Sequence, residues 1–230
     1  MIYTFDTRIR FSEVDENEYL KCENFINYFQ DCSTFQSEDL GLGLDYLREN
    51  RQVWVLTSWQ IEIIRYPKLC DRVTVGTMAY DFKSFLGYRN FFMKDENGEM
   101  IAKANSIWVL LSTQTGRPVK PSEKQLENYG KEEKLDMNYL SRKIEVPDNL
   151  KKTGEIIVTE SHLDTNHHVN NGQFVKMAVA SINGEKRPEG IRVEYKNQAY
   201  LSDRIHVFSD GKVVDMRNEE GDSYCVVEIV

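Results

Sequence analysis

Histidine, aspartate and asparagine gather in one short segment of the chain. Three of the four histidines fall within residues 161–171, which read Ser-His-Leu-Asp-Thr-Asn-His-His-Val-Asn-Asn. A histidine can act as a general base near neutral pH, and a carboxylate a few residues away can orient it or activate water. Asp164, Asn166 and His168 are therefore candidate catalytic residues.

The segment stands directly before a predicted helix. Apolar residues recur at helical spacing from Phe174 to Ile182. Unpaired N–H groups at a helix start, together with the positive end of the helix dipole, can stabilise negative charge on a carbonyl oxygen. Asn170 or Asn171 is expected to cap this helix.

A second, earlier copy of the pattern indicates an internal duplication. Its loop keeps Asp15 and Asn17, but it has Tyr19 in place of His168 and contains no histidine. One copy is thus predicted to carry the chemistry while the other shapes a pocket. The matched segments occur in the same order in both halves: 14–17 with 163–166, 61–62 with 193–194, and 71–73 with 203–205.

Each copy predicts one helix followed by four strands joined by short turns, and therefore an α+β fold with an antiparallel sheet. The domains are expected at 1–117 and 154–230, and a connector, rich in charge and punctuated by proline, is expected at 118–153 on the surface. The helices are predicted at 23–39 and 174–182, and the strands at 52–64, 71–81, 86–94, 99–112, 190–197, 203–209, 212–218 and 223–230.

Composition excludes several classes of function. A net charge of −8 argues against general nucleic-acid binding. No apolar run is long enough to span a membrane, and no signal segment is visible at the start. The four cysteines are widely spaced, which favours reduced thiols in a cytoplasm and argues against a zinc site. The Gly-x-Ser-x-Gly pattern of a serine hydrolase is missing from the sequence.

Residues 163–171 resemble the active-site segment of plant and bacterial acyl-acyl-carrier-protein thioesterases, which read approximately Leu-Asp-x-Asn-x-His-Val-Asn-Asn. The resemblance covers essentially the whole chain. It implies two tandem hot-dog domains, each a central helix wrapped by an antiparallel sheet. It also implies hydrolysis of fatty acyl-carrier thioesters by activated water, with acyl carrier protein as partner, no cofactor, and Asp164, Asn166 and His168 as the catalytic trio.

One departure from the family pattern affects the division of roles. Family members commonly carry Glu-Cys where this chain has Gln198-Ala199, so no cysteine nucleophile and no acid stand there. Gln198 could still hold water or the thioester carbonyl by hydrogen bonding. Asn170, Phe25 and Phe29 are further candidates for substrate binding, the two aromatic residues as lining of the acyl pocket or, equally, as ordinary core.

Three alternatives stay open. The protein could act on acyl-CoA instead of the acyl carrier protein, or bind acyl groups without cleaving them, which Gln198 favours. A hydratase or dehydratase uses the same fold, but the single set of histidines weighs against it. A homodimer is compatible with the sequence.

Overall fold

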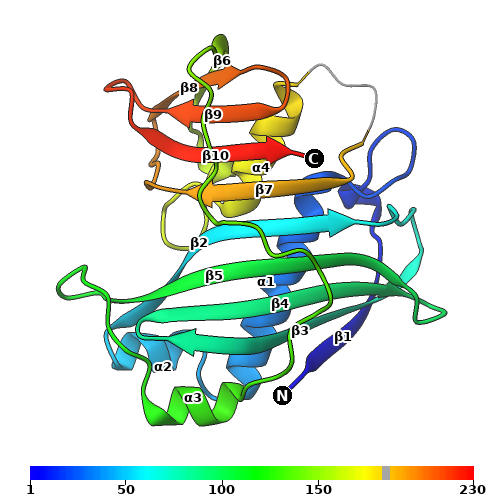
Figure 1. The fold of residues 1–230 in the computed structure, drawn as a ribbon, viewed down its shortest axis with the longest axis vertical. Helices are drawn as coiled ribbons and strands as arrows, with labels where there is room; N and C mark the ends of the chain where they lie inside the picture. Colours follow the sequence, from blue (N-terminus) through cyan, green and yellow to red (C-terminus); the bar gives the residue numbers. More distant parts are fainter. Residues whose placement is uncertain (183–186) are drawn as a thin grey trace.

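Ten antiparallel strands form one continuous sheet in the computed structural model, which describes residues 1–182 and 187–230 (Figure 1). The strand order β1-β3-β4-β5-β2-β7-β10-β9-β8-β6 keeps the strands of each copy together. The predicted α+β class with an antiparallel sheet is confirmed. The strands are β1 (Tyr3–Arg8), β2 (Gln52–Ile63), β3 (Arg72–Lys83), β4 (Leu86–Asp95), β5 (Met100–Ser112), β6 (Lys151–Ile157), β7 (Gly190–Tyr195), β8 (Arg204–Ser209), β9 (Val213–Arg217) and β10 (Ser223–Ile229).

Two helices lie against the same face of this sheet (Figure 1). They are α1 (Cys22–Asp39) and α4 (Asn171–Ala180), both close to the predicted positions. Two shorter helices, α2 (Leu44–Glu49) and α3 (Glu123–Tyr129), lie at the end of the sheet that belongs to the first copy. No helix in the described part of the chain is long and apolar enough to cross a membrane.

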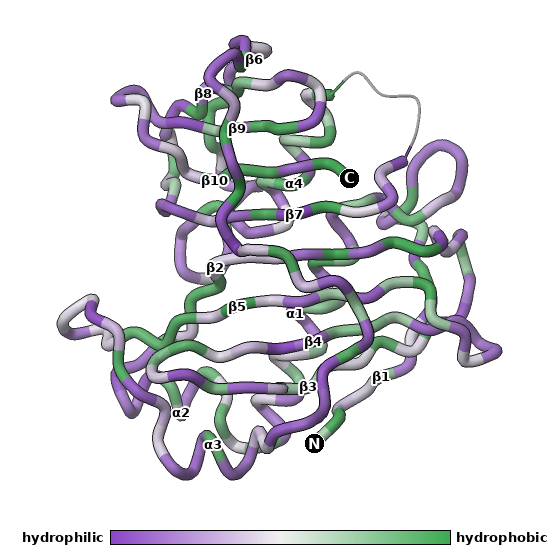
Figure 2. Tube along the Cα trace, viewed as in Figure 1, coloured by the Kyte–Doolittle hydropathy of each residue, from purple (hydrophilic) through white to green (hydrophobic). Residues whose placement is uncertain are grey.

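The core fills the space between the helices and the sheet. Successive strand residues point to opposite faces, so Trp59 and Ile61 are buried beneath the helices, whereas Gln60 between them faces the other way. In Figure 2, hydrophobic and hydrophilic residues alternate along the strands, and the loops at the sheet ends are mostly hydrophilic.

The two copies are joined edge to edge by one strand pair. β2 pairs with β7 in antiparallel register from Ser58 opposite Glu194 to Glu62 opposite Gly190. A side chain at Gly190 would place its Cβ 2.8 Å from the Ile61 carbonyl oxygen, so glycine permits this close approach. The copies therefore share a sheet, and the domain limits 1–117 and 154–230 stay an interpretation of the sequence.

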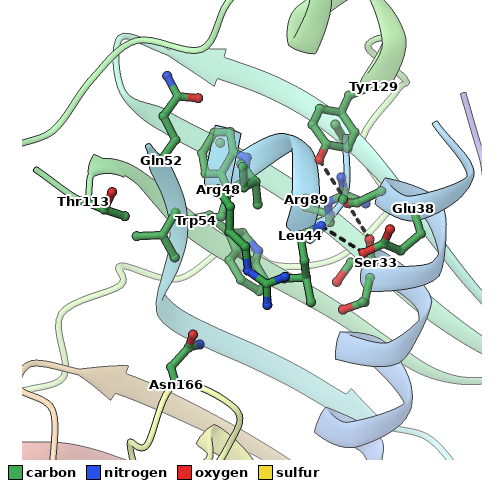
Figure 3. Close-up of a pocket in the computed structure, with 18 of the residues that line it drawn as sticks. Ser33, Glu38, Leu44, Arg48, Gln52, Trp54, Arg89, Thr113, Tyr129 and Asn166 are labelled. Carbon is green, nitrogen blue, oxygen red and sulfur yellow. Dashed lines mark hydrogen bonds between the residues drawn. The ribbon is translucent and has the colours of Figure 1, made fainter. Parts of the chain in front are cut away.

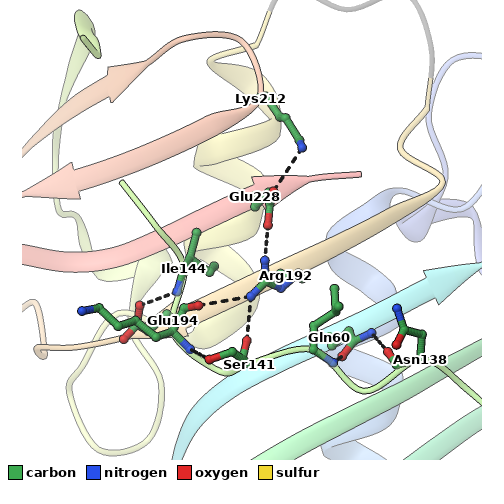
Figure 4. Close-up of polar contacts among 10 residues, drawn as sticks. Gln60, Asn138, Ser141, Ile144, Arg192, Glu194, Lys212 and Glu228 are labelled. Carbon is green, nitrogen blue, oxygen red and sulfur yellow. Dashed lines mark hydrogen bonds and ion pairs between the residues drawn. The ribbon is translucent and has the colours of Figure 1, made fainter. Parts of the chain in front are cut away.

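The segment expected as a surface connector, residues 118–153, packs against the sheet over much of its length. After α3, residues 131–150 cross the sheet face opposite α1 and α4, and we call them the strap (Figures 1 and 4). The Leu140 N–H donates to Gln60 Oε1 (3.0 Å), and the Ile144 N–H donates to Glu194 Oε2 (3.1 Å). The reason is that this face carries polar side chains that need partners. Residues 151–153, also assigned to the connector, already belong to β6.

An ion-pair group fastens the same region of the strap. Arg192 pairs with Glu228, and its Nη2 donates to the Ser141 carbonyl oxygen (2.6 Å), while Lys212 lies 3.2 Å from Glu228 (Figure 4). Ile144 itself is buried against Val213 and Val226. The strap thus has both a polar and an apolar anchor on the second copy.

We expect the apolar anchor to be measurable. Ile144 is 2% exposed, so Ile144→Ala should lower the free energy of unfolding by about 2–5 kcal/mol, as removal of a buried aliphatic side chain does. The matched control on the same strap is Leu140→Ala, because Leu140 is 43% exposed and should change the value by about 0.5 kcal/mol or less. Denaturant unfolding compares the two, and equal effects would mean that the strap is not packed on the sheet in solution.

Candidate active site

A tight turn holds the three predicted catalytic residues together. Asp164 Oδ1 accepts hydrogen bonds from the backbone N–H groups of Asn166 (2.8 Å) and His168 (3.2 Å). The Asp164 N–H donates to the His168 carbonyl oxygen (2.8 Å), which closes the turn. His167 adopts a left-handed conformation with φ of 61°, and this allows the chain to reverse within four residues. Asn166 is exposed and His168 is partly buried.

The turn leads directly into α4, as predicted. Asn170 is the N-cap, and its Oδ1 accepts from the Gly172 N–H (2.9 Å). This bond confirms the expected capping role, and a contact of Asn170 with substrate stays a prediction. Asn171 Nδ2 donates to Gln30 Oε1 on α1 (2.8 Å), so the start of α4 is tied to the first copy.

Tyr200, which was not among the sequence-predicted site residues, contacts both Gln198 and His168. The ring of Tyr200 meets the ring of His168 edge to face, with centroids 5.0 Å apart. The Tyr200 hydroxyl donates to Gln198 Oε1 (3.1 Å). Tyr200 escapes sequence reasoning because an exposed tyrosine in a turn has no distinctive spacing. Glu194, the nearest acid along that strand, faces the strap and not this site.

His162 and His206 lie outside the turn of Asp164. His162 Nδ1 accepts from the Thr159 N–H (3.1 Å), which caps a short 3₁₀ turn, and burial lowers the pKa of His162. His206 Nδ1 lies 3.2 Å from Glu155 on the neighbouring strand. Neither side chain forms a hydrogen bond with Asp164, Asn166 or His168.

The first copy contains the same turn, but the carboxylate of its aspartate, Asp15, has an additional partner. Asp15 Oδ1 accepts from the N–H groups of Asn17 (2.9 Å) and Tyr19 (3.0 Å), as Asp164 does in the second copy. However, Asp15 Oδ2 accepts from Arg187 Nε (3.0 Å) and Nη2 (2.7 Å), and the guanidinium lies over the Tyr19 ring. Among the described residues, no group bonds the second oxygen of Asp164.

The pairing with Arg187 contributes to a lowered pKa of the Asp15 carboxyl group. Burial alone raises the pKa of the Asp15 carboxyl, but hydrogen bonds from Arg187 and from the Tyr19 and Asn17 N–H groups outweigh it and lower the pKa below its usual value. The first-copy carboxylate is therefore held in an ion pair. The second-copy carboxylate keeps one oxygen for other partners.

A cavity of about 410 Å³ lies in the first copy and reaches the turn of the second. Its wall includes residues of α1, α2, β2 and the β3–β4 hairpin, together with Thr165 and Asn166 (Figure 3). Phe25 and Phe29, for which lining and core were equally expected, are fully buried and pack against Tyr66, Trp59 and Phe91 in the core, outside the wall of this cavity. The apolar wall is supplied by Leu44, Leu47, Val53, Trp54, Phe82 and Trp108.

Two of the four cysteines, Cys22 and Cys225, are poorly suited to act as nucleophiles. Cys22 and Cys225 are buried free thiols. Burial raises the pKa of Cys22 to about 12 and that of Cys225 well above its usual value, so both stay protonated at neutral pH. Across 1–182 and 187–230, no three His, Cys, Asp or Glu side chains are grouped as metal ligands would be.

A helix-covered antiparallel sheet built twice, with an Asp-x-Asn-x-His turn at the second helix, defines a tandem hot-dog protein. The family model for the acyl-ACP thioesterase N-terminal domain matches residues 2–129, more than half of the chain. The chain therefore belongs to the acyl-ACP thioesterase family.

Known proteins with similar sequences and folds agree with this assignment. An oleoyl-acyl carrier protein thioesterase from Coriandrum sativum is 25% identical over 89% of this chain, and one from Arabidopsis thaliana is 27% identical over 86%. The chain spans 61% and 60% of their lengths.

The fold is shared with two solved structures over nearly their whole lengths. An acyl-ACP thioesterase from Bacteroides thetaiotaomicron has a TM-score of 0.91 at 23% identity, covering all of this chain and 97% of its own. A 12:0-ACP thioesterase from Umbellularia californica has a TM-score of 0.84 at 18% identity, covering 99% of this chain and 96% of its own. These two likenesses concern the fold.

The ion pair in the first-copy turn gives a pH-dependent prediction. Arg187→Met should lower the free energy of unfolding by about 0.5–1 kcal/mol at pH 7, the value of a partly exposed pair. Because the folded-state pKa of Asp15 is lowered, its contribution is present above the unfolded pKa and is lost as the pH falls through the folded value. The difference between wild type and variant should therefore shrink below about pH 4.

The control for this prediction removes the titrating group. In an Asp15→Asn background, Arg187→Met should have an effect that does not vary with pH. Urea unfolding of all four proteins between pH 3 and 7 provides the measurement. A wild-type difference that is constant across this range would show that Asp15 and Arg187 are not paired in solution.

Proposed function

We propose that the protein hydrolyses the thioester of fatty acyl-acyl carrier protein and releases the free fatty acid and the holo-carrier. The observation that carries this proposal is the cavity of the first copy, which ends at Asn166 in the turn that also holds Asp164 and His168. An acyl chain in the cavity would present its thioester to this turn. The family relationship supports the same reaction.

The chemistry uses water without a covalent enzyme intermediate. Asp164, through its unbonded oxygen, or His168 takes a proton from water, which attacks the thioester carbonyl carbon. The oxyanion that forms faces N–H groups at the start of α4 and the Asn166 amide. Collapse breaks the carbon–sulfur bond, and the thiolate leaves with the proton taken from water. The products are a carboxylic acid and a thiol, and the atoms balance.

The carrier and the compartment are also part of the proposal. We favour acyl carrier protein over coenzyme A because the relatives' names specify it. The four free thiols support a reducing compartment such as the cytoplasm, although the plant relatives are named chloroplastic. A homodimer is a further proposal that solution mass measurements would test.

A single assay separates this function from its alternatives. The protein is incubated with matched acyl-carrier and acyl-CoA thioesters while free thiol is followed, and an enoyl thioester is tested for hydration. Thiol release from the carrier substrate supports the proposal, and release from CoA alone favours the acyl-CoA alternative. Binding without release would favour the acyl-binding alternative, for which Gln198 in place of an acid is the specific observation.

We expect His168 in the second copy to be required for catalysis, and Tyr19 at the matching place in the first copy not to be. His168→Ala should reduce kcat/KM for the acyl-carrier thioester by about 10²–10⁴-fold, as expected for loss of a general base, with an unchanged circular dichroism spectrum. Tyr19 occupies the matching place in the first copy, and Tyr19→Phe should leave the rate within a few-fold. Equal losses would contradict the assignment of catalysis to the second copy.

Gln198 should contribute a neutral hydrogen bond. Gln198→Ala should lower the rate by less than His168→Ala, because such a bond contributes about 0.5–1.5 kcal/mol. Tyr200→Phe removes the hydroxyl that bonds Gln198 but keeps the ring against His168, so it should reproduce the smaller loss.

Replacing Gln198 by glutamate tests whether an acid at this position can act as the base. Gln198→Glu should be tolerated, and its pH–rate profile should gain an acidic limb if the new carboxylate becomes the base. The measurement is thioester hydrolysis from pH 5 to 9. Abolished activity in Gln198→Ala with retained activity in His168→Ala would mean that the roles of these two residues are reversed.

A further inference from the structure

The cavity has a cationic end away from the candidate catalytic turn. Arg89 on β4 belongs to its wall, as do Ser33 and Ser37 of α1 and Tyr129 of α3. In Figure 3, Asn166 and Arg89 lie on different sides of the cavity, and Arg89 is grouped with Ser33 and Tyr129. The two ends are therefore chemically different: one meets the turn of the second copy, and the other presents a guanidinium and hydroxyl groups. Glu38 also belongs to the wall at this second end, where its Oε1 accepts from the Leu44 N–H (2.9 Å) and its carboxylate is not paired with Arg89.

Arg89 is buried without a counter-ion. It is 8% exposed, and no carboxylate among the described residues lies within ion-pair distance of it. Its Nη1 donates to Gln36 Oε1 and to Thr77 Oγ1 (3.2 Å), and its guanidinium lies over the Tyr129 ring, 5.1 Å from the centroid. In the described chain, its Nε and Nη2 have no acceptor, and neither atom is sealed from the cavity or solvent.

Burying the Arg89 guanidinium against a hydrocarbon chain is energetically unfavourable. A guanidinium stays protonated at any physiological pH, and a buried charge is normally paired. A plain acyl chain that filled the cavity would remove water from Arg89 and return no hydrogen bond. An oxygen atom on the chain, placed against the guanidinium, would instead accept from its fixed donors.

We propose that this enzyme prefers acyl chains that carry an oxygen acceptor remote from the thioester, a terminal carboxylate or hydroxyl, and that Arg89 recognises that oxygen. The inference rests on the proposed thioesterase function and specifies its substrate class. The Leu44, Leu47, Val53 and Trp54 side chains would line the hydrocarbon between the two polar ends. A terminal hydroxyl and a terminal carboxylate both offer an oxygen that accepts a hydrogen bond from the Arg89 guanidinium. The carboxylate also neutralises the positive charge of Arg89.

The test compares three carrier thioesters of equal chain length. One ends in a methyl group, one in a hydroxyl and one in a carboxylate. For the wild type, kcat/KM should be highest for an oxygenated chain. In Arg89→Met, the ratio of the oxygenated to the plain substrate should fall by about tenfold or more, which corresponds to the loss of a hydrogen bond to a charged group. Arg89→Lys, which keeps the charge, should give a smaller fall.

A matched control lies away from the cavity. Arg142 on the strap is exposed and does not belong to the wall. Arg142→Met should leave the substrate ratio unchanged. A purely structural role for Arg89, tying β4 to α1 and α3, predicts reduced thermal stability of Arg89→Met with the same substrate ratio as the wild type, and that result would overturn the proposal.

A binding measurement keeps the test independent of turnover. Calorimetric titration compares the methyl ester of a plain fatty acid, which carries no free carboxylate, with the methyl ester of its terminally hydroxylated counterpart on wild type and Arg89→Met. Tighter binding of the hydroxylated ester by the wild type alone supports the proposal, and equal binding of the two esters by the wild type overturns it. Failure of all three thioesters to react, with hydroxyl-selective binding intact, would instead count against the thioesterase function.

Discussion

The pairing of β2 with β7 is the interaction on which the rest of the structure depends. It places Trp59 and Ile61 of the first copy beside Ile191 and Val193 of the second, all buried under the helices. It thereby fixes α4 beside α1. Gly172 allows this helix contact, because a Cβ there would lie 2.6 Å from Asn27 Oδ1. Without this junction, the turn of Asp164 would have no cavity to face.

The two Asp turns share one backbone conformation but differ in the partners of their carboxylates. Both keep an aspartate whose first oxygen is used by the backbone, so the local conformation needs the aspartate whether or not chemistry occurs there. What differs is the second oxygen. In the first copy, Arg187 from the second copy neutralises it, and Tyr19 packs against that guanidinium. The first-copy aspartate is thus kept for shape and for the contact between the copies.

The sequence predicts what depends on local pattern. The helices α1 and α4 and the strands from β2 to β5 follow from periodicity and from turn residues such as Gly98 and Gly221, which have positive φ values of 81° and 92°. Asp164, Asn166 and His168 could be found because a turn places residues that are close in sequence close in space.

Contacts between distant segments could not be predicted in the same way. The pair of Arg187 with Asp15 joins residues 172 positions apart, and the ring of Tyr200 reaches His168 from a separate turn. The position of Phe29 was ambiguous for a related reason, because an aromatic residue on the buried face of a helix suits a core and a pocket equally well. The strap was underestimated because its anchors, such as Gln60 and Glu194, lie on other elements.

The difference in length between the copies accounts for the position of the cavity. In the first copy, α1 has 18 residues and the strands β2 to β5 have 10 to 13, whereas in the second copy α4 has 10 residues and the strands β7 to β10 have 5 to 7. The longer first copy extends beyond its core, and α2 and α3 cover the extension without filling it. The space left there is the cavity, and Arg89 lies in its wall beside Gln36 and Thr77, whose buried oxygens accept hydrogen bonds from the guanidinium and so allow a charged side chain to be buried at this place.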